Sequence, residues 1–228
     1  MTQPRPRMAV VLSGCGVFDG AEIHEAVLTM LAIARQGGEY QCFAPNVDQH
    51  HVVNHLTGTE MNETRNVLVE SARIARGRVE DMKAYDPAHF DALVMPGGFG
   101  AAKNLSSFAF DGPGCTVDAD VADAVRRTHA AGKPIGALCI APVILAKVLG
   151  DGELTIGEDA QVASAIEAMG ARHRKAGHGE VVVDEGLRIV TTPCYMLDAT
   201  IDQIAQGADN AIRALLDLAR RPARSAAE

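Results

Sequence analysis

Residues 136–145 read GALCIAPVIL, and this stretch decides the fold because an apolar run changes there from strand to helix. The residues before Cys139, IGAL, form a short apolar run typical of a buried strand. The residues after it, IAPVILAKVLG, carry apolar side chains at helical spacing. Pro142 falls in the first helical turn, where its missing N–H is not needed. We therefore expect Cys139 at a sharp turn between a strand and a helix.

The same alternation of strand and helix runs along the chain on both sides of this turn. Predicted strands are MAVVLS (8–13), EYQCFAP (39–45), DALVMPGGFG (91–100), LTIG (154–157), VVVD (181–184) and RIVTTP (188–193). Predicted helices lie within 22–38, 64–75, 116–134, 140–150, 159–170 and 198–219, and the helix of 116–134 is expected to be capped near Thr116 or Asp118. Alternating strands and helices indicate an α/β fold with a mostly parallel sheet and helices on both faces.

Length and composition favour one domain. A chain of 228 residues that is 47% hydrophobic can bury one substantial core. We expect a single domain over residues 8–219. The polar ends, residues 1–7 and 220–228, are predicted to be disordered tails.

Charge and cysteine content exclude several classes of protein. The net charge of −8 argues against a nucleic-acid surface, which needs clustered Lys and Arg. No apolar run is long enough for a membrane span, and the N-terminal run MAVVL is too short for a signal peptide. Five cysteines without C-x-x-C spacing favour neither a disulfide framework nor a zinc ribbon. We expect a cytoplasmic protein that binds neither nucleic acid nor membrane.

Cys139 has two interpretations from the residues alone. Ala137 and Ala141 place small side chains two positions to either side of it, as a nucleophile turn requires. The N-terminal end of the following helix would then face the sulfur and lower the thiol pKa. Alternatively, Cys139 is a small, inert core residue, as many free cysteines are.

Other residues at the same predicted edge of the sheet could complete a site. Backbone N–H groups of the PGGFG loop and of Ile140 could bind an oxyanion, and Gly97 and Gly98 would let the backbone approach closely. Glu22 and Glu25 lie one helical turn apart at the start of the first helix. They either compensate the helix dipole or, in an apolar pocket, supply a carboxyl with a raised pKa. His24, between them, is expected to point elsewhere.

The predicted site and its surroundings resemble a known superfamily over residues 8 to about 218. GAEIHEAVLTMLAIARQGG, VMPGGFGAAKNL and GALCIAP are similar to the ThiJ/PfpI superfamily, which has a glutamine-amidotransferase-like fold. Five blocks in order resemble its ElbB branch, the isoprenoid-biosynthesis glyoxalases: VVLSGCGVFDGAEIHEA, NHLTGTEMNETRNVL, PGGFGAAKNL, CIAP and IVTTPCYML.

The resemblance implies a flavodoxin-like three-layer sandwich, commonly a homodimer. It implies that Cys139 is the nucleophile, that Glu25 is its acidic partner with Glu22 as second choice, and that Gly98 and Ile140 provide backbone donors. The implied reaction converts a small dicarbonyl, glyoxal, to glycolate through a cysteine hemithioacetal without a cofactor.

One departure leaves a second function open. Relatives with strong activity carry a histidine soon after the cysteine helix, where this chain reads LTIGEDAQ. His178 could approach the site from another loop, and Cys15 and Cys194 could line the pocket because both follow strand ends. The alternative to an enzyme is a redox-sensing or protein-interaction module that uses the same reactive cysteine.

A metal site is not predicted. His51 and His55 in HHVVNH would share one face if that segment were a helix, but no acidic partner lies at tight spacing. We interpret the pair as part of a polar surface.

Overall fold

A seven-stranded sheet forms the centre of the protein, in the order β10-β11-β7-β6-β1-β2-β5. The computed structural model describes residues 5–222. Every neighbouring pair is parallel except β10 and β11. The strands are β1 (Arg7–Val11), β2 (Glu39–Ala44), β5 (Val79–Asp81), β6 (Ala92–Met95), β7 (Ile135–Leu138), β10 (Val182–Asp184) and β11 (Ile189–Thr192). The predicted mostly parallel sheet is confirmed.

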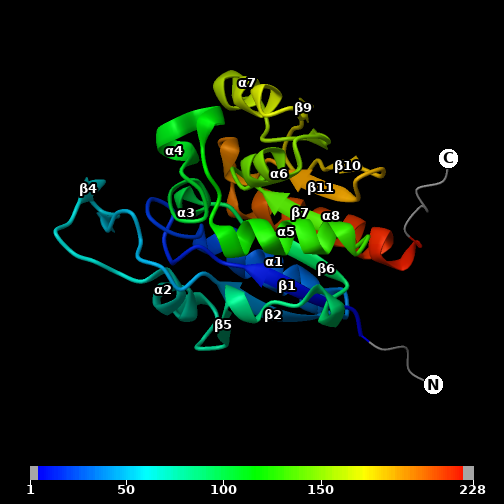
Figure 1. The fold of residues 1–228 in the computed structure, drawn as a ribbon, viewed down its shortest axis with the longest axis horizontal. Helices are drawn as coiled ribbons and strands as arrows, with labels where there is room; N and C mark the ends of the chain where they lie inside the picture. The colour runs from blue at the N-terminus through cyan, green and yellow to red at the C-terminus, as the bar shows by residue number, and fades with distance from the viewer. Residues whose placement is uncertain (1–4, 223–228) are drawn as a thin grey trace.

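Helices cover both faces of this sheet. They are α1 (Ile23–Arg35), α2 (Val67–Ile74), α3 (Phe99–Lys103), α4 (Phe108–Asp111), α5 (Ala119–Ala130), α6 (Pro142–Leu149), α7 (Ala160–Ala168) and α8 (Ile201–Arg220). Helices α1 and α8 pack together on one face, and α5 and α6 pack on the other, where α5 crosses in front of the strands in Figure 1. The described chain also has four short 3₁₀ turns: Met82–Ala84, Pro87–His89, Gly112–Gly114 and Cys194–Met196.

Alternation along the strands divides the interior into two cores. In β1, Ala9 and Val11 face the core shared with α5 and α6, whereas Met8 and Val10 face the core shared with α1 and α8. Successive side chains of a strand point to opposite faces, so a strand buried on both faces must be apolar at every position. This arrangement is the predicted flavodoxin-like three-layer sandwich.

The helix starts follow local capping chemistry. Asp118 caps α5 by accepting the backbone N–H groups of Asp120 and Val121, which selects Asp118 over Thr116. Thr200 and Gln203 form a reciprocal capping box at the start of α8.

Two short strand pairs lie outside the main sheet. Residues around His51 and His55, to which the sequence assigned no strand or helix, form a hairpin of β3 (Val53–Asn54) and β4 (Thr59–Glu60), and this hairpin projects from the sheet in Figure 1. The predicted strand at 154–157 is the shorter β8 (Glu153–Leu154), which pairs with β9 (Arg172–His173) outside the main sheet. Short polar segments of this kind have no period that distinguishes a hairpin from a helix.

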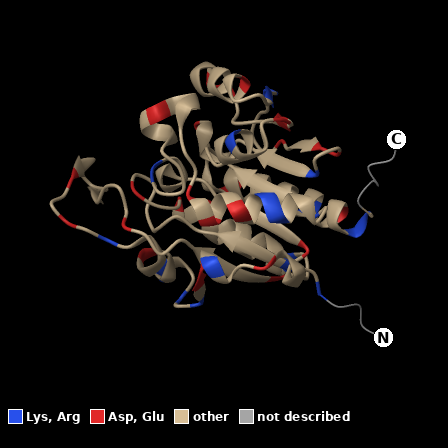
Figure 2. Cartoon of the chain, in the orientation of Figure 1, with Lys and Arg blue, Asp and Glu red and all other residues tan. Residues whose placement is uncertain are grey.

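The ends of the folded region lie slightly beyond the predicted ones. Arg7 is the first residue of β1, and α8 continues through Arg220, so neither belongs to a tail. Of the remaining tail residues, 5, 6, 221 and 222 are described and belong to no helix or strand, whereas residues 1–4 and 223–228 lie outside the described residues. Figure 2 shows Lys and Arg distributed among Asp and Glu over the visible elements. Within the described range no helix is both long and apolar enough to cross a membrane.

Candidate active site

Cys139 occupies a strained turn between β7 and α6. Its φ is 59°, in the left-handed region that a residue with a side chain seldom adopts and that costs about 1–3 kcal/mol. The backbone N–H of Cys139 donates to the Thr192 carbonyl (2.9 Å), and the Ala141 N–H donates to the Leu138 carbonyl (3.0 Å). Ala137 and Ala141 are fully buried on either side. The predicted strand, turn and helix are therefore present, and residues 138–141 are called the cysteine turn below.

Glu25 reaches the cysteine turn from the first turn of α1. Its side chain is fully buried and hydrogen-bonds to the Cys139 thiol. Glu25 Oε2 accepts the Gly97 N–H (2.9 Å), and Oε1 accepts the Tyr195 N–H (3.2 Å). Three strand ends, those of β6, β7 and β11, thus surround one carboxyl group.

Gly97 and Gly98 permit this close packing. A Cβ at Gly97 would lie 2.4 Å from the Cβ of Cys139 and 2.8 Å from Glu25 Oε2. At Gly98, φ is 95°, and a Cβ would lie 2.3 Å from the backbone nitrogen of Glu22. No larger residue fits either position without displacing the site.

Two backbone donors point at the sulfur. The N–H groups of Gly98 and Ile140 both hydrogen-bond to the Cys139 side chain. Such a pair can hold negative charge on sulfur or on the oxygen of an adduct formed there. The structure therefore brings together the four residues named for this role, Cys139, Glu25, Gly98 and Ile140.

The pKa values of the two buried acids correct one prediction. Burial raises the pKa of Glu25 to about 7, against the lowering effect of the Tyr195 N–H. Burial also raises the pKa of Cys139 well above its usual value, and the charge of Glu25 adds to this. The predicted lowering of the thiol pKa by the helix N-terminus is wrong, because the Gly98 and Ile140 N–H groups do not outweigh burial and Glu25. Thiolate can form here only when Glu25 takes up the proton.

Glu22 has a different position from Glu25. It caps α1, with Oε2 accepting the Glu25 N–H at 2.7 Å. Its side chain lines a cavity of about 410 Å³ that opens beside Cys139. The remaining lining residues are Val17, Gly98, Phe99, Ala102, Phe108, Ala109, Cys139, Ile140, Asp159, Val162, Tyr195 and Met196.

Tyr195 is a site residue that the sequence interpretation missed. Besides binding Glu25 through its N–H, it lines the cavity, and its hydroxyl hydrogen-bonds to His24 Nδ1 at 2.9 Å. His24 itself is exposed and does not line the cavity, so it contacts the site only through Tyr195. The sequence did hold a signal for Tyr195. It lies just after β11, which pairs in parallel with β7, and Cys139 lies just after β7.

The other predicted pocket residues separate into two groups. Cys194 is buried, with φ 44°, and the charges of Glu25 and Cys139 act on its thiol, so it lies close to this site but does not line the cavity. Cys15 lies instead among Glu70, Arg73 and Asp19, and burial is the main cause of its raised pKa. His178 is exposed and does not line the cavity. Neither Cys15 nor His178 lines the cavity, so the prediction that they do is wrong, although the loop of Cys15 reaches the cavity through Val17.

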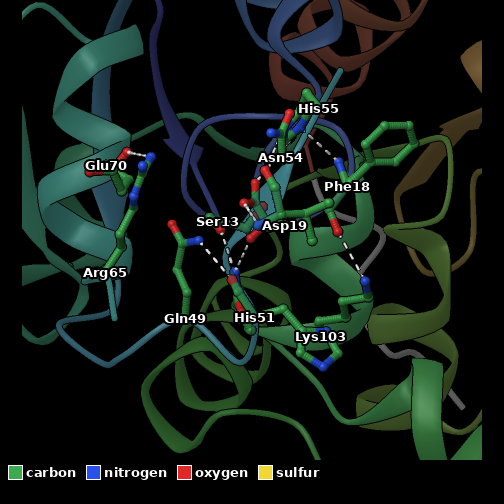
Figure 3. A network of polar contacts seen from close by, with 12 residues as sticks. Ser13, Phe18, Asp19, Gln49, His51, Asn54, His55, Arg65, Glu70 and Lys103 are labelled. Atoms are coloured by element: carbon green, nitrogen blue, oxygen red, sulfur yellow. Dashed lines mark hydrogen bonds and ion pairs between the residues drawn. The ribbon is translucent and has the colours of Figure 1, made fainter. Parts of the chain in front are cut away.

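A polar network anchors the loop that leads into α1 (Figure 3). Asp19 Oδ2 accepts the Val53 N–H (2.8 Å), and Lys103 Nζ donates to the Phe18 carbonyl (2.9 Å). His55 Nε2 accepts the Phe18 N–H (3.2 Å), while Nδ1 lies 3.0 Å from the Val53 carbonyl, a pattern that fits a neutral ring protonated on Nδ1. These contacts hold the loop before α1 against the β3–β4 hairpin and α3. They thereby position the start of α1, where Glu22 and Glu25 lie.

The histidines of this segment bind protein groups. His51 Nε2 lies 3.7 Å from a Glu60 oxygen, and His55 Nε2 lies 3.8 Å from Asp19 Oδ1. Within residues 5–222, no three His, Cys, Asp or Glu side chains gather as a metal site would require.

The model of the DJ-1/PfpI family matches residues 15–194, which include both Glu25 and Cys139. The chain belongs to the DJ-1/PfpI family. The resemblance found from the sequence motifs is thereby confirmed. This DJ-1/PfpI protein is similar to the human glutamine amidotransferase-like class 1 domain-containing protein 3, mitochondrial. The two sequences are 46% identical over 96% of this chain and 86% of the relative. It is 45% identical to the rat ES1 protein homolog, mitochondrial, over 95% of this chain and 85% of the relative.

Two solved structures share the fold of this DJ-1/PfpI chain. An isoprenoid biosynthesis protein with an amidotransferase-like domain from Ehrlichia chaffeensis superposes with a TM-score of 0.88 at 39% identity, covering 93% of this chain and 99% of the other. Glyoxalase III of Candida albicans shares the fold, with a TM-score of 0.59 at 17% identity over 92% of this chain and 97% of the other.

Proposed function

We propose that this protein is a cofactor-independent glyoxalase that converts a small dicarbonyl such as glyoxal to a hydroxy acid such as glycolate. One observation carries the proposal: the Cys139 thiol and the Glu25 carboxyl share a hydrogen bond beneath two backbone N–H donors, at the wall of a cavity. A nucleophile, a proton carrier and an oxyanion site are the groups that an internal redox reaction of a dicarbonyl needs.

The first step is addition of sulfur to one aldehyde carbon. Glu25, as carboxylate, accepts the thiol proton while the new C–S bond forms. The carbonyl oxygen becomes an oxyanion, which the N–H groups of Gly98 and Ile140 stabilise until it is protonated to the hemithioacetal. The raised pKa of Glu25, about 7, allows this carboxyl both to accept and to donate a proton near neutral pH.

The second step moves hydrogen between the two carbons of the adduct. Glu25 removes the C–H proton from the carbon bound to sulfur, giving an enediol, and a proton is then delivered to the neighbouring carbon. The product is a thioester of glycolate on Cys139. Water hydrolyses the thioester, so that one glyoxal and one water yield one glycolate and the free thiol.

The test is turnover of glyoxal in D₂O by the purified protein and by Cys139→Ala. We expect glycolate that carries solvent deuterium on its CH₂ carbon, and loss of turnover in the variant. Cys115→Ala removes a buried thiol outside the cavity and serves as the control. Unchanged turnover by Cys139→Ala, with the control also active, would falsify the nucleophile assignment.

A redox-sensing or protein-interaction module is the second candidate function, and the position of Cys194 favours its redox form. Cys194 is buried beside this site, where burial first and then the charges of Glu25 and Cys139 raise the pKa of its thiol. A peroxide could oxidise Cys139 to a sulfenic acid with release of water, and higher oxidation would give a sulfinic acid. Mass analysis after mild peroxide treatment tests this function: oxidation of Cys139 in a protein without glyoxal turnover supports the sensor.

We also propose that the protein is a homodimer formed through the outer face of α1. Ile23, Val27 and Leu31 recur every four residues there and are 42%, 43% and 38% exposed. An apolar stripe on one helix face is suited to contact with a second copy.

The cytoplasm is the proposed compartment, because all five cysteines are free thiols, which suits a reducing environment. The alternative compartment is the mitochondrion, because the human and rat relatives are named as mitochondrial proteins. Fractionation of cells that express the full-length protein distinguishes the two.

A further inference from the structure

The second step of the proposed reaction requires a proton donor. Glu25 takes the proton from the carbon bound to sulfur, and a proton must then reach the neighbouring carbon. Glu25 is fully buried, so unless its proton exchanges with solvent it can return only the hydrogen that it removed. A second donor with a path to solvent would make the reaction independent of this exchange.

The cavity offers one hydroxyl group for this role. Among the described residues that line it, Tyr195 alone carries a side-chain hydroxyl, and none carries a side-chain N–H group. The thiol of Cys139 is used as the nucleophile. The carboxylates of Glu22 and Asp159 accept backbone N–H groups at the starts of α1 and α7. The Tyr195 hydroxyl is therefore the side-chain group best suited to donate a proton to a ligand in the cavity.

Tyr195 connects the buried carboxyl group with an exposed imidazole. Its hydroxyl oxygen lies 2.9 Å from His24 Nδ1, and the centroids of the two rings are 5.9 Å apart. His24 is exposed, so its ring can exchange protons with water. The backbone N–H of Tyr195 donates to Glu25 Oε1 at 3.2 Å. One residue thus contacts Glu25 through its backbone and the solvent-exposed His24 through its side chain.

The phenol of Tyr195 is protonated near neutral pH. Burial raises its pKa, and the charges of Glu22 and Glu25 raise it further. A phenol in this state serves as a donor and not as a base. Histidine is the side chain that gains and loses a proton near neutral pH, so an imidazole beside the hydroxyl is suited to restore a proton that the hydroxyl gives up.

We propose that Tyr195 is a second acid–base residue of this site, and that His24 is a positioning residue that orients the Tyr195 hydroxyl and returns its proton. The chemistry of this proposal rests on the glyoxalase function. The contact of the hydroxyl with a ligand bound to Cys139 does not depend on that function and can be measured by itself.

The proton transfers balance over one turnover. Glu25 takes the proton of the sulfur-bound carbon, and the electron pair of that C–H bond forms the C=C bond of the enediol. The hydroxyl proton of the sulfur-bound carbon passes to the oxygen of its neighbour. The O–H bond of Tyr195 then breaks while a C–H bond forms on the neighbouring carbon. The phenolate takes a proton from the His24 imidazolium, which takes one from water, and Glu25 returns its proton to water.

Turnover of glyoxal in D₂O by Tyr195→Phe tests the hydroxyl. We expect kcat to fall about 10²–10⁴-fold, as for the loss of a positioned acid. The glycolate still formed should carry less deuterium on its CH₂ carbon than the wild-type product, because Glu25 then returns the hydrogen that it removed. Tyr40→Phe, which removes an exposed phenol outside the cavity, is the matched control. An unchanged kcat or an unchanged deuterium content in Tyr195→Phe would overturn the role of the hydroxyl.

Chemical rescue tests the role of His24. We expect His24→Ala to lower kcat about tenfold or more with little change in KM, because the phenolate regains its proton more slowly. Added imidazole should restore kcat, since the position of His24 is open to solvent. A residue that only stabilises the fold would not be replaced in this way. His178→Ala removes another exposed histidine outside the cavity and is the control. An unchanged kcat, or a loss that imidazole does not restore, would remove His24 from the reaction.

A measurement without turnover separates this inference from the proposed function. Alkylation of Cys139 with iodoacetamide attaches an amide whose carbonyl oxygen can accept the Tyr195 hydroxyl. NMR of protein with isotopically labelled histidine then follows the His24 ring. We expect the Nδ1 resonance of His24 to shift on alkylation of the wild type and to stay in place in Tyr195→Phe.

The two proposals fail in different ways in this measurement. If no aldehyde is turned over but the His24 resonance shifts, the glyoxalase proposal fails, and the Tyr195 hydroxyl still stands as the donor that links the cavity to His24. If the resonance of the wild type does not move, or moves equally in Tyr195→Phe, the hydroxyl does not reach a ligand on Cys139. That result overturns the inference whatever the protein turns over.

Discussion

The carboxyl group of Glu25 and the thiol of Cys139 are joined by a hydrogen bond inside the protein, and burial raises the pKa of both. Two negative charges cannot be held together in such a site, so the pair retains at least one proton near neutral pH. Glu25 accepts two backbone N–H groups at 2.9 and 3.2 Å, which keeps its carboxyl in contact with the sulfur in either protonation state. The two residues therefore act as one proton-sharing unit.

This unit predicts a pH dependence of stability. The pKa of Glu25 rises from 4.5 in the unfolded chain to about 7 in the folded protein, so the folded state binds this proton more tightly. The resulting stabilisation is complete below pH 4.5 and is lost as the pH rises through about 7. We expect it to amount to about 3 kcal/mol in the free energy of unfolding.

Urea unfolding of the wild type and of Glu25→Gln, at both ends of this pH range, measures the effect. Because glutamine does not titrate, the variant should lose less stability over this range than the wild type by about that amount. Glu158→Gln, at an exposed position, is the control. Identical pH dependence in all three proteins would show that Glu25 has an ordinary pKa.

The two glutamates of α1 should differ in their effect on turnover. Glu25 touches the thiol, whereas Glu22 caps the helix through Oε2 and faces the cavity. Loss of a positioned acid–base group lowers the rate about 10²–10⁴-fold, so Glu25→Gln should reduce kcat for glyoxal by that range. Glu22→Gln preserves the cap and should retain most of kcat for this uncharged substrate. The reverse order of effects would assign the proton transfer to Glu22.

Gly97 should tolerate no side chain. In Gly97→Ala the new methyl group would meet the Cβ and Sγ of Cys139 at 2.4 and 2.9 Å, so either the cysteine turn or the loop that contains Gly97 and Gly98 must move. We expect turnover to fall at least about tenfold, because catalysis depends on sub-ångström placement of the reacting groups.

The matched control for Gly97 is Gly114→Ala, where no atom lies within 4 Å of the added carbon. It should retain full activity and an unchanged Tm. A crystal structure of active Gly97→Ala with an undisturbed Cys139 would contradict the packing argument.

The centre of this site was predictable from sequence because its signals are local. Small residues around Cys139, Pro142 in the first helical turn and the paired glycines each reflect a backbone constraint within a few residues. The thiol pKa was not predictable, because its direction depends on the burial of Glu25 against Cys139, a contact between residues far apart in the chain. The contact of His24 with Tyr195 and the β3–β4 hairpin also depend on long-range contacts.

The outer face of α1 should control the oligomeric state. Val27 lies at the centre of the exposed stripe formed with Ile23 and Leu31. Val27→Asp places a charge in the proposed interface, where it would be buried without a partner, so we expect a dimer to become a monomer in sedimentation velocity at micromolar concentration. Leu56→Asp provides the comparison, because Leu56 is 93% exposed on the β3–β4 hairpin and lies outside the stripe. A monomeric wild type would show that the protein does not form the dimer. A Val27→Asp variant that sediments as a dimer would show that the interface does not include this face of α1.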